Sequence, residues 1–465
     1  MLRYGVVIAA LVPAIAVADS QRFRREYVIE PAPHIDVVPN KIFVNRCVGG
    51  CVIRHGTTTD ATTHTSTIPA APMSTLSEWA WTDAEWADLV QCMKDVYSPY
   101  NVVVTDVQPA PTEDYNEALV AGLPSELGLP NNYGGIAPIA PGCQVVDHGM
   151  SFSFANLYVA TTERVHEICW TAAQEVGHTY GLDHEYEFFD HTSACNDPMT
   201  YRDDCGGEKF FRNKTAHCGE YQARDCLCSL QQTDHKLLTA ILGPGTPTTT
   251  GKVSITSPAA GDMIANGSPV HATASAQRGV VTVQLLLNGY KWMEMPGVAV
   301  GPTGQPEADY PLMLPSDVPD GVIDIQVVER DDLDIAAMSQ TVTVTKGAPC
   351  VTADTCAVGQ QCAAGKCFWE PPAGELGDAC TYPQFCKSAR CDTLDGASYC
   401  TQDCIPGDTT SCPTGLECLA STPDLGMCWP PSSGGCCSSG RGSGWVHFAL
   451  SALVLGIAVR RRRRR

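Results

Sequence analysis

The chain has 465 residues, a formal net charge of -21 and 24 cysteines. This length allows about three domains, and such an acidic chain argues against nucleic acid or anionic lipid as a partner. Solubility is the simplest reason for the acidity. Processing at both ends would remove eight arginines, Arg3, Arg441 and Arg460 to Arg465, and take the charge from -21 to -29.

Residues 1–18 have the features of a secretory signal peptide. Arg3 precedes an apolar run from Val6 to Ala14, and Ala16-Val17-Ala18 has the small residues of a cleavage site. An exported chain meets oxidants, so we expect most cysteines to form disulfides. Metal binding by Cys47 and Cys51, or by Cys226 and Cys228, is the alternative.

Residues 19–245 alternate strand and helix signals, which predicts a layered α+β domain. Ile42-Phe43-Val44 and Val102-Val103-Val104 predict strands. Between them, a capping box from Thr82 to Glu85 opens an apolar helical periodicity that continues to about Tyr97. Further strands are expected within residues 134–158, including Val145-Val146 and Phe152 to Tyr158. Thr161 or Thr162 is expected to cap the next helix.

The segment from Gln174 to His184 has the residue types and spacing of a hydrolytic zinc site. On a helix, Gln174 and His178 lie four residues apart and share one face. Glu175 projects beside them. Gly181 can adopt the left-handed conformation that ends a helix, which turns the chain and brings His184 towards the same point.

This segment resembles the signature of the metzincin zinc endopeptidases, His-Glu-x-x-His-x-x-Gly-x-x-His with a Met-turn downstream. The matching residues are Glu175, His178, Gly181 and His184, and Asp197-Pro198-Met199-Thr200-Tyr201 is similar to the Met-turn. Gln174 departs from the signature, because it stands where the family has its first histidine. An amide is a poorer zinc donor than an imidazole.

The resemblance implies a Zn²⁺ cofactor held by His178 and His184, with Gln174 as a weaker contact. Zinc lowers the pKa of its bound water towards about 7. Glu175 would take the proton of that water and pass it to the leaving amine. The resemblance also implies that Met199 forms the hydrophobic floor of the site, and that Tyr201 is an extra ligand or steadies the oxyanion.

Three further expectations follow from the same resemblance, and a fourth, for His191, follows from its nearness in sequence to the site. In the family, the strand edge before the active-site helix binds substrate backbone, which we assign to Ser151 to Tyr158. An N-terminal cysteine can cap the zinc in relatives, so Cys47 is a candidate inhibitor unless it pairs with Cys51. Glu185 is similar to the residue after the third histidine in the astacin branch, or is a surface glutamate. His191 is a runner-up ligand.

Residues 252–346 follow a Thr/Pro/Gly linker and contain about seven short alternating strands. This pattern predicts an immunoglobulin-like β-sandwich, with a hairpin turn at Asn288-Gly289. It serves as a spacer or as a binding module. Residues 350–428 hold twelve cysteines in 79 residues, so this small cysteine-rich module depends on cross-links whose pairing the sequence leaves open.

Residues 432–465 form a three-part tail: a Gly/Ser-rich stretch with Gly435-Cys436-Cys437, an apolar span from Trp445 to Val459, and six arginines. Fifteen helical residues reach about 22 Å, less than the ~30 Å hydrocarbon core. The tail resembles the myxobacterial C-terminal sorting signal (MYXO-CTERM), which implies processing near Cys436 and display on the outer surface. A short transmembrane anchor is the alternative.

Two functions fit these features. The first is an exported, surface-displayed zinc endopeptidase of metzincin type that acts on proteins or peptides. The second is a catalytically inactive relative that serves as a surface binding or adhesion protein. Gln174 is the residue that separates them.

Overall fold

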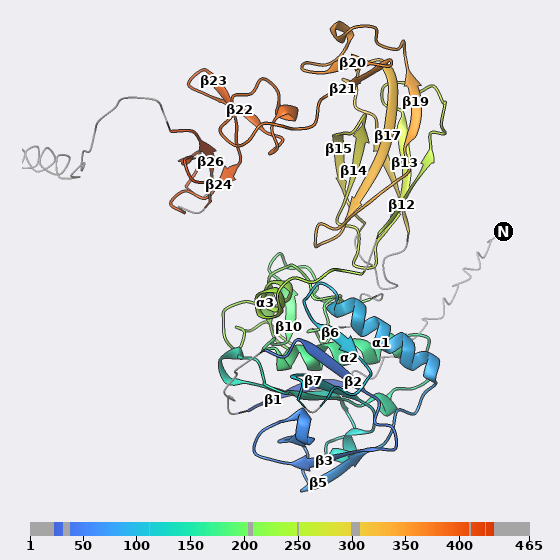
Figure 1. The fold of residues 1–465 in the computed structure, drawn as a ribbon, viewed down its shortest axis with the longest axis vertical. Helices are drawn as coiled ribbons and strands as arrows, with labels where there is room; N and C mark the ends of the chain where they lie inside the picture. Colours follow the sequence, from blue (N-terminus) through green and yellow to red (C-terminus); the bar gives the residue numbers. More distant parts are fainter. Residues whose placement is uncertain are drawn as a thin grey trace, which may run out of the picture. The chain divides into compact units, whose positions relative to one another are not determined.

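The computed structural model describes residues 23–30, 38–110, 112–202, 208–248, 251–298, 307–408, 411–423 and 425–431. The predicted signal peptide (1–18) and the predicted sorting signal (432–465) lie outside these residues. The chain divides into two compact units, residues 1–357 with 362–368, and residues 358–361 with 369–465. The described protein is mostly β, with several separate sheets (Figure 1). No helix in this part is long and apolar enough to cross a membrane.

A six-stranded mixed sheet organises the N-terminal half, in the order β1-β8-β9-β7-β2-β6. Its strands are β1 (Arg24–Ile29), β2 (Lys41–Asn45), β6 (Val103–Thr105), β7 (Asn116–Val120), β8 (Tyr133–Ile139) and β9 (Met150–Ser153). Neighbouring strands run parallel, except β8 and β9, which run antiparallel. The strands predicted around Ile42 and Val103 are therefore confirmed.

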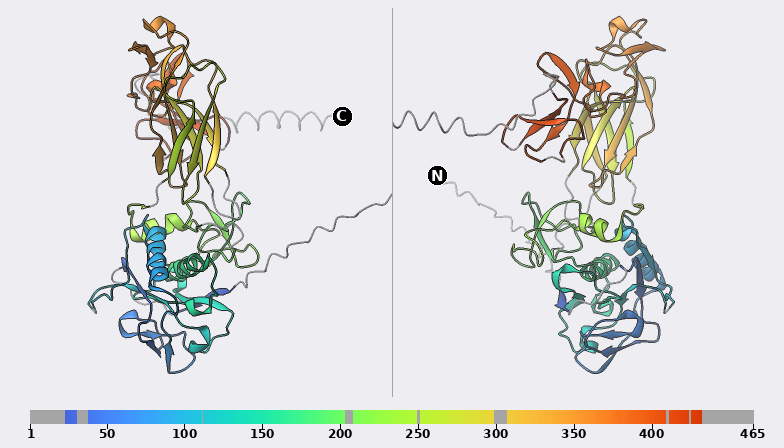
Figure 2. Two further views of the ribbon diagram at one scale, coloured as in Figure 1. Left: turned by 90° about the vertical axis from the view of Figure 1, so that its right-hand side faces the viewer. Right: turned by 60° about the vertical axis from the view of Figure 1, so that its left-hand side comes forward.

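Helices α1 (Asp83–Tyr97) and α2 (Arg164–Thr179) pack over one face of this sheet (Figures 1 and 2). Because side chains alternate along a strand, Ala118 and Val120 of β7 join the helices in one apolar core, whereas Leu119 joins a second core. That second core also contains residues of the small sheet formed by β3 (Cys51–His55), β4 (Thr65–Ser66) and β5 (Met73–Leu76). The Cys92–Cys169 disulfide links the two helices.

The ends of α1 match the sequence prediction, and the start of α2 does not. The Thr82 side chain accepts from Glu85 N, and the Glu85 carboxylate accepts from Thr82 N. Helix α2 has Glu163 at its N-cap, without a side-chain capping bond. The cap expected from Thr161 or Thr162 is therefore wrong.

Two strand predictions before α2 also need correction. Val145-Val146 lies in a loop, and the stretch from Phe152 to Tyr158 leaves the sheet after Ser153 and forms a 3-10 turn at Ala155–Leu157. Strand β9 has neighbours on both sides, β8 and β7. The assignment of a substrate-binding edge to Ser151 to Tyr158 is therefore wrong: residues 151–153 are internal to the sheet with their backbone bonds already used, and the rest of the stretch lies outside the sheet.

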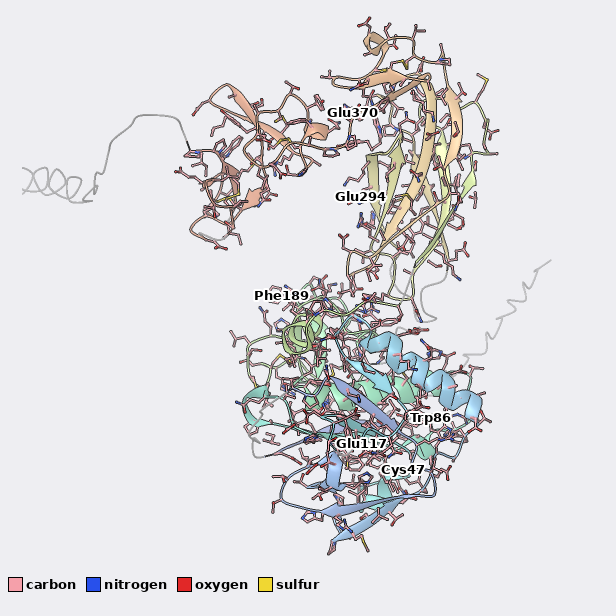
Figure 3. The ribbon with its side chains drawn as sticks, in the orientation of Figure 1. Cys47, Trp86, Glu117, Phe189, Glu294 and Glu370 are labelled. Atoms are coloured by element: carbon pink, nitrogen blue, oxygen red, sulfur yellow. A yellow bond between two sulfur atoms is a disulfide. The ribbon has the colours of Figure 1, made fainter. Side chains whose placement is uncertain are left out.

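Glu117 on β7, labelled in Figure 3, is a buried acid outside the segment from Gln174 to His184. The Asn45 side chain donates to Glu117 Oε1 over 2.7 Å, and His64 Nε2 lies 3.7 Å from Oε2. Burial raises the pKa of Glu117 to about 7, although the bond from Asn45 lowers it. This group links stability to pH, as discussed below.

The rest of the N-terminal half is held by short elements and disulfides. These elements are β10 (Glu185–Phe188), β11 (Ala216–Cys218) and α3 (Asp234–Leu242). The disulfides Cys143–Cys228 and Cys218–Cys226 cross-link this region. Helix α3 ends at Leu242, and Gly243 is its C-cap.

Residues 252–346 form two packed sheets around one apolar core. One sheet contains β12 (Lys252–Ser257), β13 (Pro269–Ser275) and β16 (Ala308–Met313). The other contains β14 (Thr282–Leu287), β15 (Tyr290–Pro296), β17 (Gly321–Arg330), β18 (Ala336–Met338) and β19 (Val342–Lys346). Asn288 and Gly289 both have positive φ, 49° and 84°, and connect β14 to β15, which confirms the predicted hairpin.

The twelve cysteines from Cys350 to Cys428 form six disulfides. They are Cys350–Cys362, Cys356–Cys367, Cys380–Cys391, Cys386–Cys400, Cys404–Cys418 and Cys412–Cys428. The strands here are β20 (Gln361–Ala363), β21 (Lys366–Phe368), β22 (Cys391–Leu394), β23 (Ala397–Cys400), β24 (Asp403–Cys404), β25 (Glu417–Ala420) and β26 (Gly426–Trp429). Such short strands depend on cross-links because they enclose little apolar volume.

Candidate metal centre

Helix α2 carries three residues of the motif at its C-terminal end. Gln174, Glu175 and His178 are fully buried there. The helix ends at Thr179, and Gly181 has a φ of +89°. A Cβ at Gly181 would lie 2.2 Å from the Cys143 carbonyl oxygen, so only glycine fits. The chain then turns and brings His184 Nε2 to 3.0 Å from His178 Nε2.

Each histidine is held through its other ring nitrogen. His178 Nδ1 lies 2.7 Å from the Leu182 carbonyl oxygen, and His184 Nδ1 lies 2.9 Å from Glu220 Oε1. A carbonyl and a carboxylate can only accept, so both Nδ1 atoms carry the proton. Burial, followed by the charge of His184, lowers the pKa of His178 to about 3, which keeps this ring neutral. The two Nε2 atoms face each other across this 3.0 Å separation.

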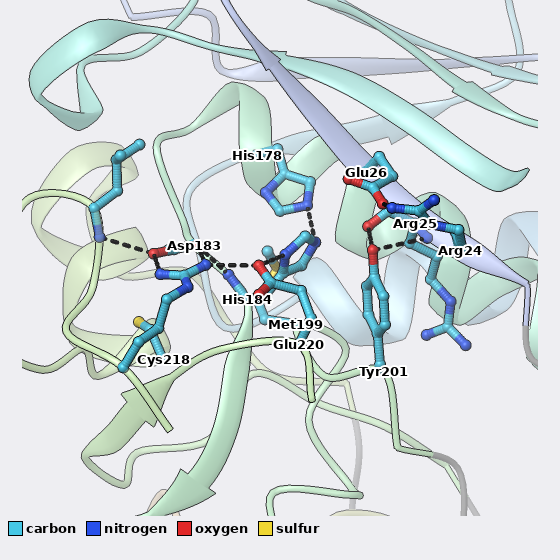
Figure 4. A network of polar contacts seen from close by, with 12 residues as sticks. Arg24, Arg25, Glu26, His178, Asp183, His184, Met199, Tyr201, Cys218 and Glu220 are labelled. Atoms are coloured by element: carbon cyan, nitrogen blue, oxygen red, sulfur yellow. Dashed lines mark hydrogen bonds and ion pairs between the residues drawn. The ribbon is translucent and has the colours of Figure 1, made fainter. Parts of the chain in front are cut away.

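Glu220 is an ionised carboxylate with its own support. The hydrogen bond from His184 and then that from Arg224 hold the pKa of Glu220 well below its usual value. Arg224 also makes two bonds to Asp183, of 2.6 and 2.8 Å. Asp183 accepts from the backbone N–H of His184 and of Leu227. This network fixes the orientation of the His184 ring (Figure 4).

Asp183, His184 and Glu220 also lie near enough to one another to be considered as a cation site. Arg224 already supplies the positive charge at the two carboxylates. We therefore assign this group to the support of His184.

Glu175 is a buried acid three residues before His178 on α2. Both of its carboxylate oxygens are buried without a hydrogen-bond partner among the described residues. Burial raises the pKa of Glu175 well above its usual value, and the charge of Arg25 opposes this. A Cβ at Gly135 on β8 would lie 2.4 Å from Glu175 Oε1. Gly135 therefore leaves the space that this carboxylate occupies.

Met199 lies in a buried turn that packs against α2. Asp197 Oδ1 accepts from Met199 N over 2.9 Å, and Asp197 Oδ2 accepts from Arg212 N over 2.7 Å. A Cβ at Gly177 would lie 2.7 Å from Met199 Sδ. Gly177 thus lets the methionine sulfur pack directly against the helix.

The other two predicted site residues contact Arg25 on β1. Gln174 Oε1 accepts from Arg25 Nη1 over 3.2 Å, and Gln174 Nε2 donates to the Met199 carbonyl over 3.4 Å. Tyr201 Oη donates to the Arg25 carbonyl and accepts from Arg25 N. Burial raises the pKa of Tyr201 far above its usual value, so it is a neutral phenol. Its ring centroid lies 4.8 Å from that of His184.

Sequence reasoning missed the residues that β1 contributes. The Tyr27 ring lies 5.1 Å from that of His178 and 5.2 Å from that of His184, measured between centroids. Alternation in Arg25-Glu26-Tyr27 is a weak strand signal, hidden by the neighbouring basic residues. Glu220 was also missed, because nothing in its local sequence marks it as the partner of a histidine 36 positions away.

The remaining candidates are placed elsewhere. Cys47 forms a disulfide with Cys51, so it has no thiol to cap a metal. Cys226 and Cys228 are likewise used in disulfides. The His191 side chain is 79% exposed and faces Glu187, so it is not a runner-up ligand. Glu185 is buried, which corrects the surface alternative.

No family model and no curated protein match this chain. Among solved structures it is similar to fibronectin(III)-like modules of Clostridium thermocellum CbhA, with 16% identity over 20% of this chain and 94% of that one and a TM-score of 0.15. Myroilysin matches with 11% identity over 37% and 59% of the two chains and a TM-score of 0.15. Catalytically inactive OgpA from Akkermansia muciniphila, solved with an O-glycopeptide, matches with 7% identity over 70% and 96% and a TM-score of 0.17. With TM-scores this low, we base nothing on these likenesses.

Proposed function

We propose that this protein is an exported, surface-displayed zinc endopeptidase with a metzincin-like catalytic domain at residues 19–245. The observation that carries the proposal is the pair of Nε2 atoms 3.0 Å apart, each on a ring whose Nδ1–H already donates to another acceptor. Two lone pairs at that separation repel each other unless a cation lies between them. A buried pair of this kind therefore favours a metal.

The donor set is the type that zinc prefers. Neutral imidazole nitrogens bind zinc well, and a carboxylate that accepts from the far side of a ligating ring is its usual support. His178 and His184 would hold the ion, and the motif resemblance points to Gln174 Oε1 and Tyr201 Oη as the oxygens that would complete the set. Bound zinc lowers the pKa of a water to about 7 and polarises a carbonyl.

The protein's own residues account for the proton transfers. Glu175 has no hydrogen-bond partner among the described residues, so in its carboxylate form it would accept a proton from the attacking water. The same carboxyl then delivers the proton to the leaving amine. Tyr201, kept as a phenol by burial, is suited to donate to the oxyanion once its bond to Arg25 is broken.

The motif adds support from the sequence. Glu175, His178, Gly181 and His184 resemble the metzincin signature, and Asp197 to Tyr201 resembles its Met-turn. The disulfides agree with an oxidising compartment. The predicted signal peptide and the sorting-signal-like tail complete the proposal of display on the outer surface, with protein or peptide as substrate.

A second candidate, an inactive relative that binds other molecules at the cell surface, is favoured by one contact. Gln174 Oε1 accepts from the Arg25 guanidinium. If His184 carried a second proton, it could donate from Nε2 to His178 and form an ion pair with Glu220, and no metal would be needed.

Metal content and proteolysis separate the two functions. The endopeptidase predicts about one zinc per purified chain and casein cleavage that Glu175→Gln abolishes while zinc content is retained. The inactive relative predicts a chain without zinc and without cleavage, in which Gln174→His creates both. Zinc-free wild-type protein would refute our proposal.

A further inference from the structure

Strand β1 presents opposite faces to the site and to solvent. Because side chains alternate along a strand, Arg25 and Tyr27 point to one side, and Arg24 and Glu26 point to the other. Arg25 is only 8% exposed. Arg24 and Glu26 form an ion pair with side chains 44% and 27% exposed. Near the candidate site, the strand therefore has an ion pair on its outer face and site contacts on its inner face (Figure 4).

The inner face contacts most parts of the site. The Arg25 guanidinium donates to Gln174 Oε1 over 3.2 Å and to the Thr200 carbonyl over 3.1 Å. Its charge acts on Glu175. The Arg25 backbone satisfies both hydrogen-bonding functions of Tyr201 Oη. Tyr27 lies against both histidine rings.

The backbone of β1 occupies the outer side of β8, the strand that carries Gly135 beside Glu175. Pairing is parallel, with Arg25 opposite Gly135 and Tyr27 opposite Ala137. Strand β9 covers the other side of β8. An extended peptide can therefore add to β8 next to Glu175 only where β1 now lies.

We propose that β1 is an autoinhibitory strand: Tyr27 covers the histidine pair, Arg25 binds beside it, and Gln174 is the acceptor that holds the strand in place. This inference rests on the proposed function for its consequence, because displacement of β1 would open β8 to an extended peptide and free Gln174 Oε1 and Tyr201 Oη. It also gives the glutamine a role that a histidine could not perform as well, since an amide oxygen is a good acceptor for a guanidinium.

Histidine labelling tests the closure without requiring metal. Diethyl pyrocarbonate modifies accessible imidazoles, and mass spectrometry of the full, metal-stripped chain gives the rate at His178 and His184 relative to exposed His191. The inner-face variant is Arg25→Ala with Tyr27→Ala. The matched control, Arg24→Ala with Glu26→Ala, alters the outer face of the same strand. Tyr27→Phe keeps the covering ring.

We expect the inner-face variant to label the histidine pair at least tenfold faster than wild type, and the control and Tyr27→Phe to label it at the wild-type rate. Unchanged amide exchange in α2 would show that the variant is folded. Equal rates in inner-face variant and wild type, or equal acceleration by the outer-face control, would overturn the proposal. In zinc-loaded protein, the inner-face variant should also cleave casein at least tenfold faster. A chain that binds no zinc would refute the peptidase, while the labelling would still decide the strand.

Discussion

Glu220 offers a direct way to perturb the candidate metal centre without touching a ligand. Its carboxylate accepts from His184 Nδ1 over 2.9 Å, and its side chain is 29% exposed. Loss of such a supporting partner weakens metal binding roughly 10 to 100-fold, about 1.4 to 2.7 kcal/mol. Glu220→Gln keeps an acceptor but removes the charge, so it should fall at the lower end. Glu220→Ala also frees the ring and should reach the upper end.

The assay is competition for zinc between the purified chain and a chelator of known affinity at neutral pH. Glu187→Gln is the matched control, because Glu187 faces His191 at the surface and its side chain is similarly exposed, 28%. It should leave zinc affinity unchanged. If Glu220→Ala binds zinc as tightly as wild type, then His184 does not depend on Glu220, and the tautomer argument for the site is refuted.

Three further experiments test other parts of the account. The raised pKa of Glu117 means that the native state binds more protons than the unfolded state between pH 4.5 and about 7. As pH rises through this range, the free energy of unfolding should therefore fall by about 3 kcal/mol. Glu117→Gln should remove this pH dependence in urea titrations, and a dependence that persists would have to come from another group. Gly177→Ala forces a Cβ to 2.7 Å from Met199 Sδ and should lower the free energy of unfolding by about 1 to 3 kcal/mol. The double variant with Met199→Ala should lose less stability than the sum of the two single variants. A strictly additive loss would show that the two side chains do not touch. Gly135→Ala forces a Cβ to 2.4 Å from Glu175 Oε1 and should reduce casein cleavage while zinc content is retained; full activity would exclude Glu175 from the position described.

Local signals in the sequence predicted local structure well. The capping box at Thr82, the glycine stop at Gly181 and the hairpin at Asn288-Gly289 each depend on a few adjacent residues, and the structure confirms all three. The cap expected at Thr161 or Thr162 failed because a hydroxyl near a helix start is only one way to begin a helix.

Features that join distant segments were beyond the sequence. Arg25 and Gln174 are 149 positions apart, and their contact exists only because β1 adds to β8. The substrate edge was wrongly assigned to Ser151 to Tyr158 for the same reason, because the order of strands in a sheet cannot be predicted from the sequence of any one strand. The pairing of the histidines was predictable from spacing, whereas the residues that support and cover them were not.

The most direct test of the central claim is zinc K-edge X-ray absorption on the purified native chain, together with its metal content. The account predicts about one zinc per chain, with two imidazole nitrogens at about 2.0 to 2.1 Å, and loss of that signal in His178→Ala. A chain without bound zinc, or zinc whose coordination contains no imidazole, would contradict it.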